Sequence, residues 1–450
     1  MRINLDLATY YELSQIASEK VYLKLLQGVH AQNVARIREK PVIKVGFVMK
    51  VISQFAFCST IEEFLKDSRF ITELLVDDID ESKIAETRQK LRLSSELLVK
   101  LTANCEMAEY DLLFFPDPYG CRCWPYEAIP ITALVFYTHY GLHDEFFSDK
   151  WVPINLYGKF IHSILFRRYI HTNYHLEVAQ KYSHNGAYGL KMSGYPKMDY
   201  IFSQKLEYKG WKMRNPDALK IIFAPHWTIY TKRGVSNLRY NYEFMLNYAK
   251  AHPDTTSWVF KPHPALMWEA YGEGVLLKEQ AIFPTKEDWQ RYLDEWNNLP
   301  NARVELDTYM DIFQSSDCMI YDSQSFHMEY IYSQKPSLYL WRRCTESDIE
   351  WYKEYALSIG MEFDENLYIF DNGVYHHNLN DLSMAIIDCN YSCYGDDFQA
   401  ITEFIEHTAR HDTKASRRRG LFDEYFDYRK INGMLAGEYI YRDVCKVLFD

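Results

Sequence analysis

The chain has 450 residues, a formal net charge of -12 and hydrophobic residues at 48% of its positions. This length exceeds what one ordinary hydrophobic core covers, so we expect two domains. The acidic balance excludes a protein that binds nucleic acid through a basic face, because phosphate backbones require one. A small anionic substrate remains compatible with it, since such a ligand needs only local positive groups.

Cysteine usage and hydropathy favour a cytoplasmic protein. The nine cysteines are scattered without a disulfide framework, which suits a reducing compartment. Cys121 and Cys123 form the closest pair, and no second pair at metal-ligand spacing accompanies them. The charged N-terminal residues predict no signal peptide, and no run of about 18 apolar residues predicts a membrane span.

Strand-like and helix-like segments alternate along the first half of the chain. Short apolar runs typical of buried strands lie at 42–49, 71–76, 111–115 and 131–137. Helical spacing of apolar residues covers 7–38 and 81–103. This alternation predicts an α/β fold with a parallel sheet that is covered on both faces.

Residues 150–182 are rich in aromatic and basic side chains. Such a stretch is typical of a helix that packs on the core and turns its basic residues toward water. The alternative is a patch for an anionic membrane surface.

The second half repeats the alternation after a polar stretch at 204–216, where we place the domain boundary. Strands are predicted at 219–224, 257–261, 302–306, 317–321 and 337–340, and helices at 240–250, 287–296, 398–407 and 422–449.

One stretch, residues 311–336, has the pattern of a strand, a polar turn and a helix. The turn reads Asp322-Ser323-Gln324-Ser325. In one interpretation these residues only cap the helix that follows. In the other, Ser323, Ser325 and the backbone N–H groups bind a diphosphate. Glu329 lies one helical turn after Ser325, and its carboxylate suits ribose hydroxyls, although a surface position is equally open.

Three histidines occupy the same kind of place in the sequence. His139, His226 and His263 each follow the C-terminal end of an apolar strand within about two residues. Ligands of open parallel sheets bind outside the carboxyl ends of the strands. We therefore predict that these histidines line a site, although polar residues also fall at strand ends for purely structural reasons.

The chemistry of these residues suggests roles. Histidine is suited to take a proton near neutral pH. His263 lies between two prolines and close to Lys261, which favours a phosphate contact. The chain has no Gly-rich nucleotide fingerprint and no GxxxxGK[ST], GxSxG or HExxH motif. We expect no cofactor and no required metal.

With these residues in view, the second half resembles the CDP-glycerol glycerophosphotransferase family of the teichoic-acid polymerase type. The family element A-P-x-W matches 224–227, its histidine element matches 261–264, and its strand-turn of the form D-x-L-I-T-D-Y-S-S is similar to 317–325, with Glu329 and a Lys-Pro pair at 335–336 after it. The element G-Y-P-K-x-D matches 194–199. These matches span roughly residues 190–340.

The first half carries a weaker match. The family's H-G-T-P element holds a histidine proposed as general base, and its equivalent here is Thr138-His139-Tyr140-Gly141. The glycine comes two residues after the histidine instead of one, and no proline follows. The segments VIKVGFV at 42–48 and DLLFFPDPY at 111–119 look more like a branch found among capsule and surface-polysaccharide proteins.

The resemblance implies a GT-B-like α/β fold with two Rossmann-like domains facing a cleft. It implies an acceptor domain with a leading helix at 1–205, a nucleotide-donor domain at 206–405, and C-terminal helices at 406–450 that return to the N-terminal domain. The implied catalytic residues are His139 and His263. The implied donor and phosphate contacts are His226, Thr228, Lys261, Ser323, Ser325 and Glu329.

The implied activity is the transfer of glycerol-phosphate or a related polyol-phosphate from a CDP-activated donor to a hydroxyl of a glycan or lipid-linked acceptor. The setting would be cell-surface polysaccharide biosynthesis in a bacterial cytoplasm, with membrane association at the inner face as an open question. Three alternatives remain: a glycosyltransferase that uses a nucleotide sugar, a non-catalytic scaffold of a polysaccharide assembly complex, and a nucleotide-sugar 2-epimerase.

Overall fold

A computed structural model describes residues 19–50, 55–77, 93–118, 129–142, 157, 160–183, 185–203, 206–229, 235–271, 281–306, 309–322, 324–358, 363, 365–371 and 373–450. The chain divides into two compact units. Unit 1 comprises Met1–Leu142, Asp149–Ser203 and Tyr425–Asp450, and unit 2 comprises His143–Ser148 and Gln204–Glu424. Each unit contains its own parallel sheet.

Unit 1 is built on a seven-stranded sheet with the order β3-β2-β1-β4-β5-β6-β7, in which neighbouring strands are parallel. The strands are β1 (Ile43–Met49), β2 (Phe70–Val76), β3 (Leu98–Leu101), β4 (Leu112–Phe115), β5 (Leu134–Thr138), β6 (Arg167–Ile170) and β7 (Leu190–Met192). The helices are α2 (Glu19–Arg38), α3 (Cys58–Leu65), α5 (Phe160–Ile164), α6 (Asn173–Tyr182), α7 (Asp199–Ser203), α17 (Tyr428–Asn432) and α18 (Ala436–Phe449). Short 3-10 helices are η3 (Thr102–Asn104), η4 (Met107–Glu109) and η7 (Pro196–Met198).

The four strands predicted in the first half are confirmed as β1, β2, β4 and β5. The helix predicted at 81–103 is wrong at its C-terminal end, because residues 98–101 form β3 at the edge of the sheet. The stretch at 150–182 contains α5 and α6, with β6 between them. β3 and β6 lack the unbroken apolar run of β4, because Lys100, Arg167 and Arg168 interrupt them, and pairing in the sheet decides their structure. Residues 7–18, 78–92 and 150–156 lie outside the described residues.

Unit 2 has a six-stranded parallel sheet with the order β10-β9-β8-β11-β12-β15 and an antiparallel hairpin β13-β14. The strands are β8 (Leu219–Ala224), β9 (Thr256–Phe260), β10 (Ala302–Val304), β11 (Cys318–Tyr321), β12 (Ser337–Trp341), β13 (Tyr368–Asp371), β14 (Val374–His377) and β15 (Tyr391–Tyr394). The helices are α8 (Leu238–Ala251), α9 (Leu266–Glu269), α10 (Lys286–Asn298), α11 (Met310–Ser315), α12 (Gln324–Tyr330), α13 (Glu346–Ser358), α14 (Asp381–Asp388), α15 (Phe398–Glu403) and α16 (Ala415–Tyr425). Single turns are η9 (Ile331–Ser333), η10 (Glu365–Leu367) and the π-helical η11 (Phe404–Thr408).

The five strands predicted in the second half are confirmed as β8 to β12. Their nearly continuous apolar sequences fit central strands with helices on both faces, and β9 and β11 are buried along their whole length. In each sheet the chain starts in the middle, moves to one edge and then returns to fill the other side. This doubly wound order creates a switch point between β1 and β4 in unit 1 and between β8 and β11 in unit 2.

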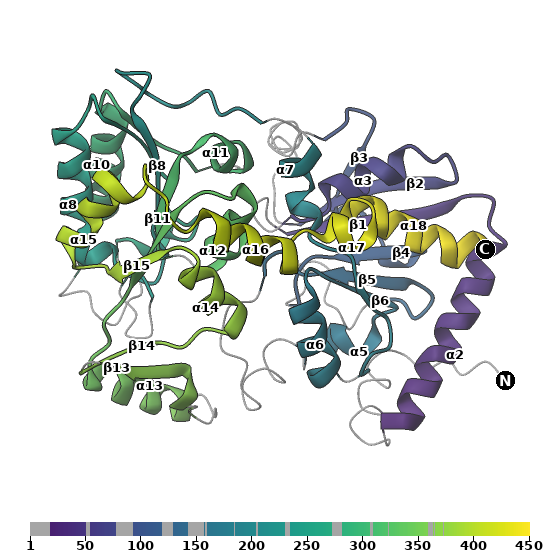
Figure 1. The fold of residues 1–450 in the computed structure, drawn as a ribbon. Helices are drawn as coiled ribbons and strands as arrows, with labels where there is room; N and C mark the ends of the chain where they lie inside the picture. Colours follow the sequence, from purple (N-terminus) through teal and green to yellow (C-terminus); the bar gives the residue numbers. More distant parts are fainter. Residues whose placement is uncertain are drawn as a thin grey trace. The chain divides into compact units, whose positions relative to one another are not determined.

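The C-terminal segment completes unit 1. Figure 1 shows α17 and α18 in yellow, beside the purple and blue N-terminal elements of that unit. Ile440, Val444 and Leu448 of α18 are buried in the same core cluster as residues of β1 and β2. Residues 425–450 therefore belong to unit 1, and residues 406–424 belong to unit 2.

Candidate functional site

The switch point of unit 2 is bridged by a buried carboxylate. Asp322 follows β11 directly, and its side chain accepts hydrogen bonds from the backbone N–H groups of His226, at 2.6 Å, and of Asn237. Burial raises the pKa of Asp322 to about 7, against the effect of these donors. Asp322 therefore fixes the loop that follows β8, and with it the backbone of His226.

His226 and His263 lie side by side at the carboxyl ends of β8 and β9, with their ring centroids 5.3 Å apart. His226 Nδ1 is 2.9 Å from Thr228 Oγ1. The backbone N–H of His263 donates to Pro225 O at 3.2 Å. The side-chain Nδ1 of His263 accepts a hydrogen bond from the Ala265 N–H at 3.1 Å. Both rings are thus held in place through Nδ1 contacts and the surrounding backbone.

The electrostatics of this pair favour an anionic ligand. Burial and the nearby charge of Lys261 together lower the pKa of His263 to about 4. Burial also holds the pKa of His226 well below its usual value, with contributions from His263 and His377. Two protonated histidine rings at this distance would repel one another, and a negative charge between them would offset that repulsion. A bound anion would therefore favour the protonated forms of both rings.

Lys261 and Glu329 are connected through Tyr309. Lys261 is only 3% exposed, and its Nζ lies 5.9 Å from the centre of the Tyr309 ring. The Tyr309 hydroxyl donates a hydrogen bond to the buried Glu329 carboxylate. Burial and Glu329 together raise the pKa of Tyr309. The structure thus places Glu329 inside unit 2, on α12, rather than at the surface.

Two serines were predicted to bind phosphate in the turn after β11. Ser325 is half-buried on α12, and Ser323 lies outside the described residues. Of the residues predicted for unit 2, the structure brings His226, Thr228 and His263 together most closely. The roles of both serines remain predictions.

Sequence reasoning missed two basic residues near this edge. Arg342 follows β12, is 5% exposed, and its Nη1 lies 3.5 Å from Thr228 O. The strand-end rule that found the histidines would also have found it. His377 ends β14 and lowers the pKa of His226. Its place on an antiparallel hairpin gave no signal in the sequence.

In unit 1, His139 follows β5, as predicted, and its ring is engaged with its own turn. Nδ1 lies 2.8 Å from Gly141 O, and the Gly141 N–H points at the same nitrogen, with 3.2 Å between the two nitrogens. If Nδ1 carries the ring hydrogen, it donates to the carbonyl oxygen and leaves Nε2 unprotonated, as a base requires. If Nδ1 accepts from the Gly141 N–H, the ring hydrogen is on Nε2. Burial lowers the pKa of His139 to about 3, and Arg168 and His175 contribute to this effect. The ring is therefore neutral near pH 7.

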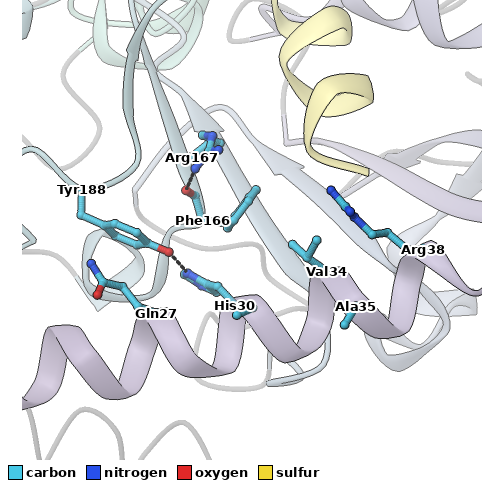
Figure 2. Close-up of a pocket in the computed structure, with 9 residues that line it drawn as sticks. Gln27, His30, Val34, Ala35, Arg38, Phe166, Arg167 and Tyr188 are labelled. Atoms are coloured by element: carbon cyan, nitrogen blue, oxygen red, sulfur yellow. Dashed lines mark hydrogen bonds between the residues drawn. The ribbon is translucent and has the colours of Figure 1, made fainter. Parts of the chain in front are cut away.

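The pocket in Figure 2 lies elsewhere in unit 1. It has a volume of about 520 Å³ and lies between α2 and the residues around Phe166 and Tyr188. Phe166 precedes β6, so this hollow is at the opposite end of that strand from the site of His139. Its polar groups are bonded within unit 1: His30 to Tyr188 at 2.8 Å, and Arg167 to Asp443 at 3.1 Å. None of the predicted site residues lines it.

Within the described ranges, no group of three or more His, Cys, Asp or Glu side chains is arranged to hold a metal ion. None of the described helices combines the length and the apolar character that crossing a membrane requires.

The two doubly wound units define a GT-B-like fold, which confirms the predicted fold class. Among solved structures, the chain is similar to a variant of the wall teichoic acid polymerase TagF soaked with CDPG. That match has 12% identity and a TM-score of 0.52 and covers 95% of this chain and 98% of the other. The resemblance to the teichoic-acid polymerase type is thus confirmed at the level of the fold.

Other matching structures include a complex with UDP and a putative epimerase. S. aureus MnaA in complex with UDP has 12% identity and a TM-score of 0.53, over 90% of this chain and 97% of that one. A putative UDP-N-acetylglucosamine 2-epimerase from Listeria monocytogenes has 10% identity and a TM-score of 0.52, over 90% and 96%. No protein-family model and no curated protein sequence matches the chain.

Proposed function

We propose that the chain is a GT-B transferase of cell-surface polysaccharide biosynthesis. It moves glycerol-phosphate or a related polyol-phosphate from a CDP-activated donor to a hydroxyl of a glycan or lipid-linked acceptor. The donor binds unit 2 and the acceptor binds unit 1. The reaction takes place in the cytoplasm, without a required metal, and a lipid-linked acceptor would bring the enzyme to the inner face of the membrane.

The observation that carries this proposal is the paired His226 and His263 at the strand ends of unit 2. Two buried rings lie 5.3 Å apart with the buried Lys261 near His263, and a bound anion would stabilise the protonated forms of both rings. A nucleotide diphosphate supplies that anion. The names of the similar structures agree with this ligand class, since one was soaked with CDPG and another contains UDP.

The proposed reaction is a direct displacement at phosphorus. His139 Nε2 takes the proton of the acceptor hydroxyl, and the acceptor oxygen forms a bond to the phosphorus that carries glycerol. The bond from this phosphorus to the bridging oxygen breaks, and CMP leaves. His226, His263 and Lys261 hold the charge on the leaving phosphate, with Thr228, Ser323 and Ser325 as further contacts and Glu329 toward the ribose.

A thermal-shift screen of the full chain with CDP-glycerol, CDP, CMP and UDP tests the donor site. We expect the cytidine nucleotides to raise the melting temperature, and His263→Ala to abolish this rise. His411→Ala, at an exposed histidine of the same unit, is the matched control and should keep it. A rise that is unchanged in His263→Ala would remove His263 from the site.

The same screen separates the alternatives. Stabilisation by UDP alone would favour a nucleotide-sugar donor, and then the product is a glycoside or an epimer. Stabilisation by none of the nucleotides would favour a non-catalytic scaffold. His139→Ala should reduce transfer by a factor of about 100 or more while the nucleotide-induced shift is retained.

A further inference from the structure

The turn at residues 139–141 sets the state of the His139 ring. The contact between His139 Nδ1 and Gly141 O, at 2.8 Å, exists only if the backbone of Tyr140 and Gly141 keeps its course. A shift of this carbonyl would let the ring hydrogen move to the other nitrogen. Contacts from other residues of unit 1 therefore have to hold the turn in this conformation.

Tyr195 holds this turn from a distant part of unit 1. Its side chain is fully buried, and its hydroxyl donates a hydrogen bond to Tyr140 O. On the other side, the Tyr140 N–H donates to Pro116 O at 2.8 Å. The two peptide groups that flank the Tyr140 Cα are thus fixed, one by Tyr195 through the Tyr140 oxygen and the other by the loop after β4 through the Tyr140 nitrogen.

His171 supports Tyr195 and the start of the same turn. Its ring stacks on the Tyr195 ring, with centroids 4.2 Å apart and an interplanar angle of 27°. Its Nε2 lies 3.4 Å from Thr138 Oγ1, and the side chain also hydrogen-bonds to the backbone of His139. One ring therefore contacts both the residue that precedes the turn and the tyrosine that fixes it.

Hydrogen bonds and close packing of the preceding backbone fix the position of Tyr195. The N–H groups of Ser193 and Gly194 both donate to Ile170 O, at 3.0 and 3.2 Å. Gly194 has a φ of +87°, and a Cβ there would overlap the ring of Tyr428. The backbone before Tyr195 is thus pinned to β6 and to the C-terminal segment.

We propose that Tyr195 and His171 are positioning residues for His139. They hold the 139–141 turn so that Gly141 O takes the Nδ1 hydrogen and Nε2 stays available as the base. This inference rests on the proposed function for its catalytic meaning.

The first test reads the ring directly and needs no substrate. In the full chain labelled with 15N-histidine, two-bond 1H–15N spectra distinguish the Nδ1–H form from the Nε2–H form, and His139→Ala assigns the signal. We expect the Nδ1–H form in the wild type and a mixture in Tyr195→Phe. Tyr169→Phe is the matched control, because its buried hydroxyl donates to Asp443 at 3.0 Å instead. An unchanged His139 signal in Tyr195→Phe would overturn the proposal.

The second test measures CMP release from CDP-glycerol with free glycerol as the hydroxyl acceptor. We expect Tyr195→Phe to lower kcat about 10- to 100-fold, with little change in the KM for the donor. In a His139→Ala background the same change should have no further effect. Equal activities of Tyr195→Phe and Tyr169→Phe would overturn the positioning role alone. Full activity of His139→Ala would overturn both that role and the proposed base.

Discussion

Two neighbouring histidine rings that are buried in the free protein resist protonation. In unit 2, His263 has a pKa of about 4 and His226 a pKa well below its usual value. Both rings are therefore neutral near pH 7 without a ligand. A bound phosphate stabilises their protonated forms and raises both pKa values, so the complex holds more protons than the free protein at pH values between the free and bound pKa.

We therefore expect CMP binding near pH 6 to take up about one proton and to tighten as the pH falls from 8 to 6. Calorimetry in two buffers with different ionisation enthalpies measures this uptake. His263→Gln should reduce it, whereas His411→Gln at the exposed control position should not. Release of protons on binding, or affinity that is independent of pH, would contradict a phosphate contact by these rings.

The strand-end rule found His139, His226 and His263 because the carboxyl ends of buried parallel strands can be recognised in the sequence. The structure adds what the rule lacks. Asp322 was interpreted only as turn geometry, but its buried carboxylate joins the loops after β8 and β11. Asp322 is 96 residues away from His226 in the sequence. The two residues meet because β11 lies next to β8 in the sheet, and no local sequence pattern reveals that strand order.

At the scale of elements, the turn at 194–199 joins three parts of unit 1. The Asp199 carboxylate accepts hydrogen bonds from Ser59 Oγ at 2.7 Å, from Tyr428 Oη at 2.5 Å and from the backbone of Ala436 and Gly437 at 3.0 and 2.8 Å. The last two N–H groups begin α18, so a distant carboxylate caps this helix. Gly437 allows the close approach, because a Cβ there would lie 2.7 Å from Thr60 N.

We expect Asp199→Ala to lower the free energy of unfolding of unit 1 by about 2–4 kcal/mol, because four buried donors lose their acceptor. Chemical denaturation, followed by hydrogen exchange of peptides from α3 and α18, measures the loss. Asp254→Asn, at a surface ion pair in unit 2, should have little effect. A stability loss for Asp199→Ala as small as that of the control would show that α18 does not depend on this cap.

The element at 194–199 was recognised in the sequence as a match to a family motif, and the structure gives its residues separate tasks. Gly194 permits the turn, Tyr195 contacts the His139 turn, and Asp199 anchors α18. Local pattern identified the stronger strands, such as β1 and β8, because their apolar runs are long. It missed β6 and β7, which have four and three residues and are formed by pairing with their neighbours.

At the scale of the whole molecule, the core of unit 1 depends on the last residues of the chain. Ile440 and Val444 of α18 pack in the same cluster as Ile61 and Phe64 of α3. The first part of this unit therefore lacks one covering helix until the end of the chain has been added. Sequence patterns predicted helices at 422–449, and only the resemblance to a family implied that they return to unit 1. Unit 2 has separate core clusters formed by residues between 208 and 409.

A chain that lacks residues 427–450 should consequently keep unit 2 and lose the stable fold of unit 1. The deletion removes the buried side chains of α18 and three of the four hydrogen bonds to Asp199. Hydrogen exchange measured by mass spectrometry should show lost protection in β1, β2 and α3, with β8, β9 and β11 protected as in the full chain. The thermal shift caused by CMP, which we assign to unit 2, should persist. Retained protection of β1 and β2 would show that unit 1 folds without its C-terminal helix, and loss of the CMP effect would show that donor binding needs unit 1.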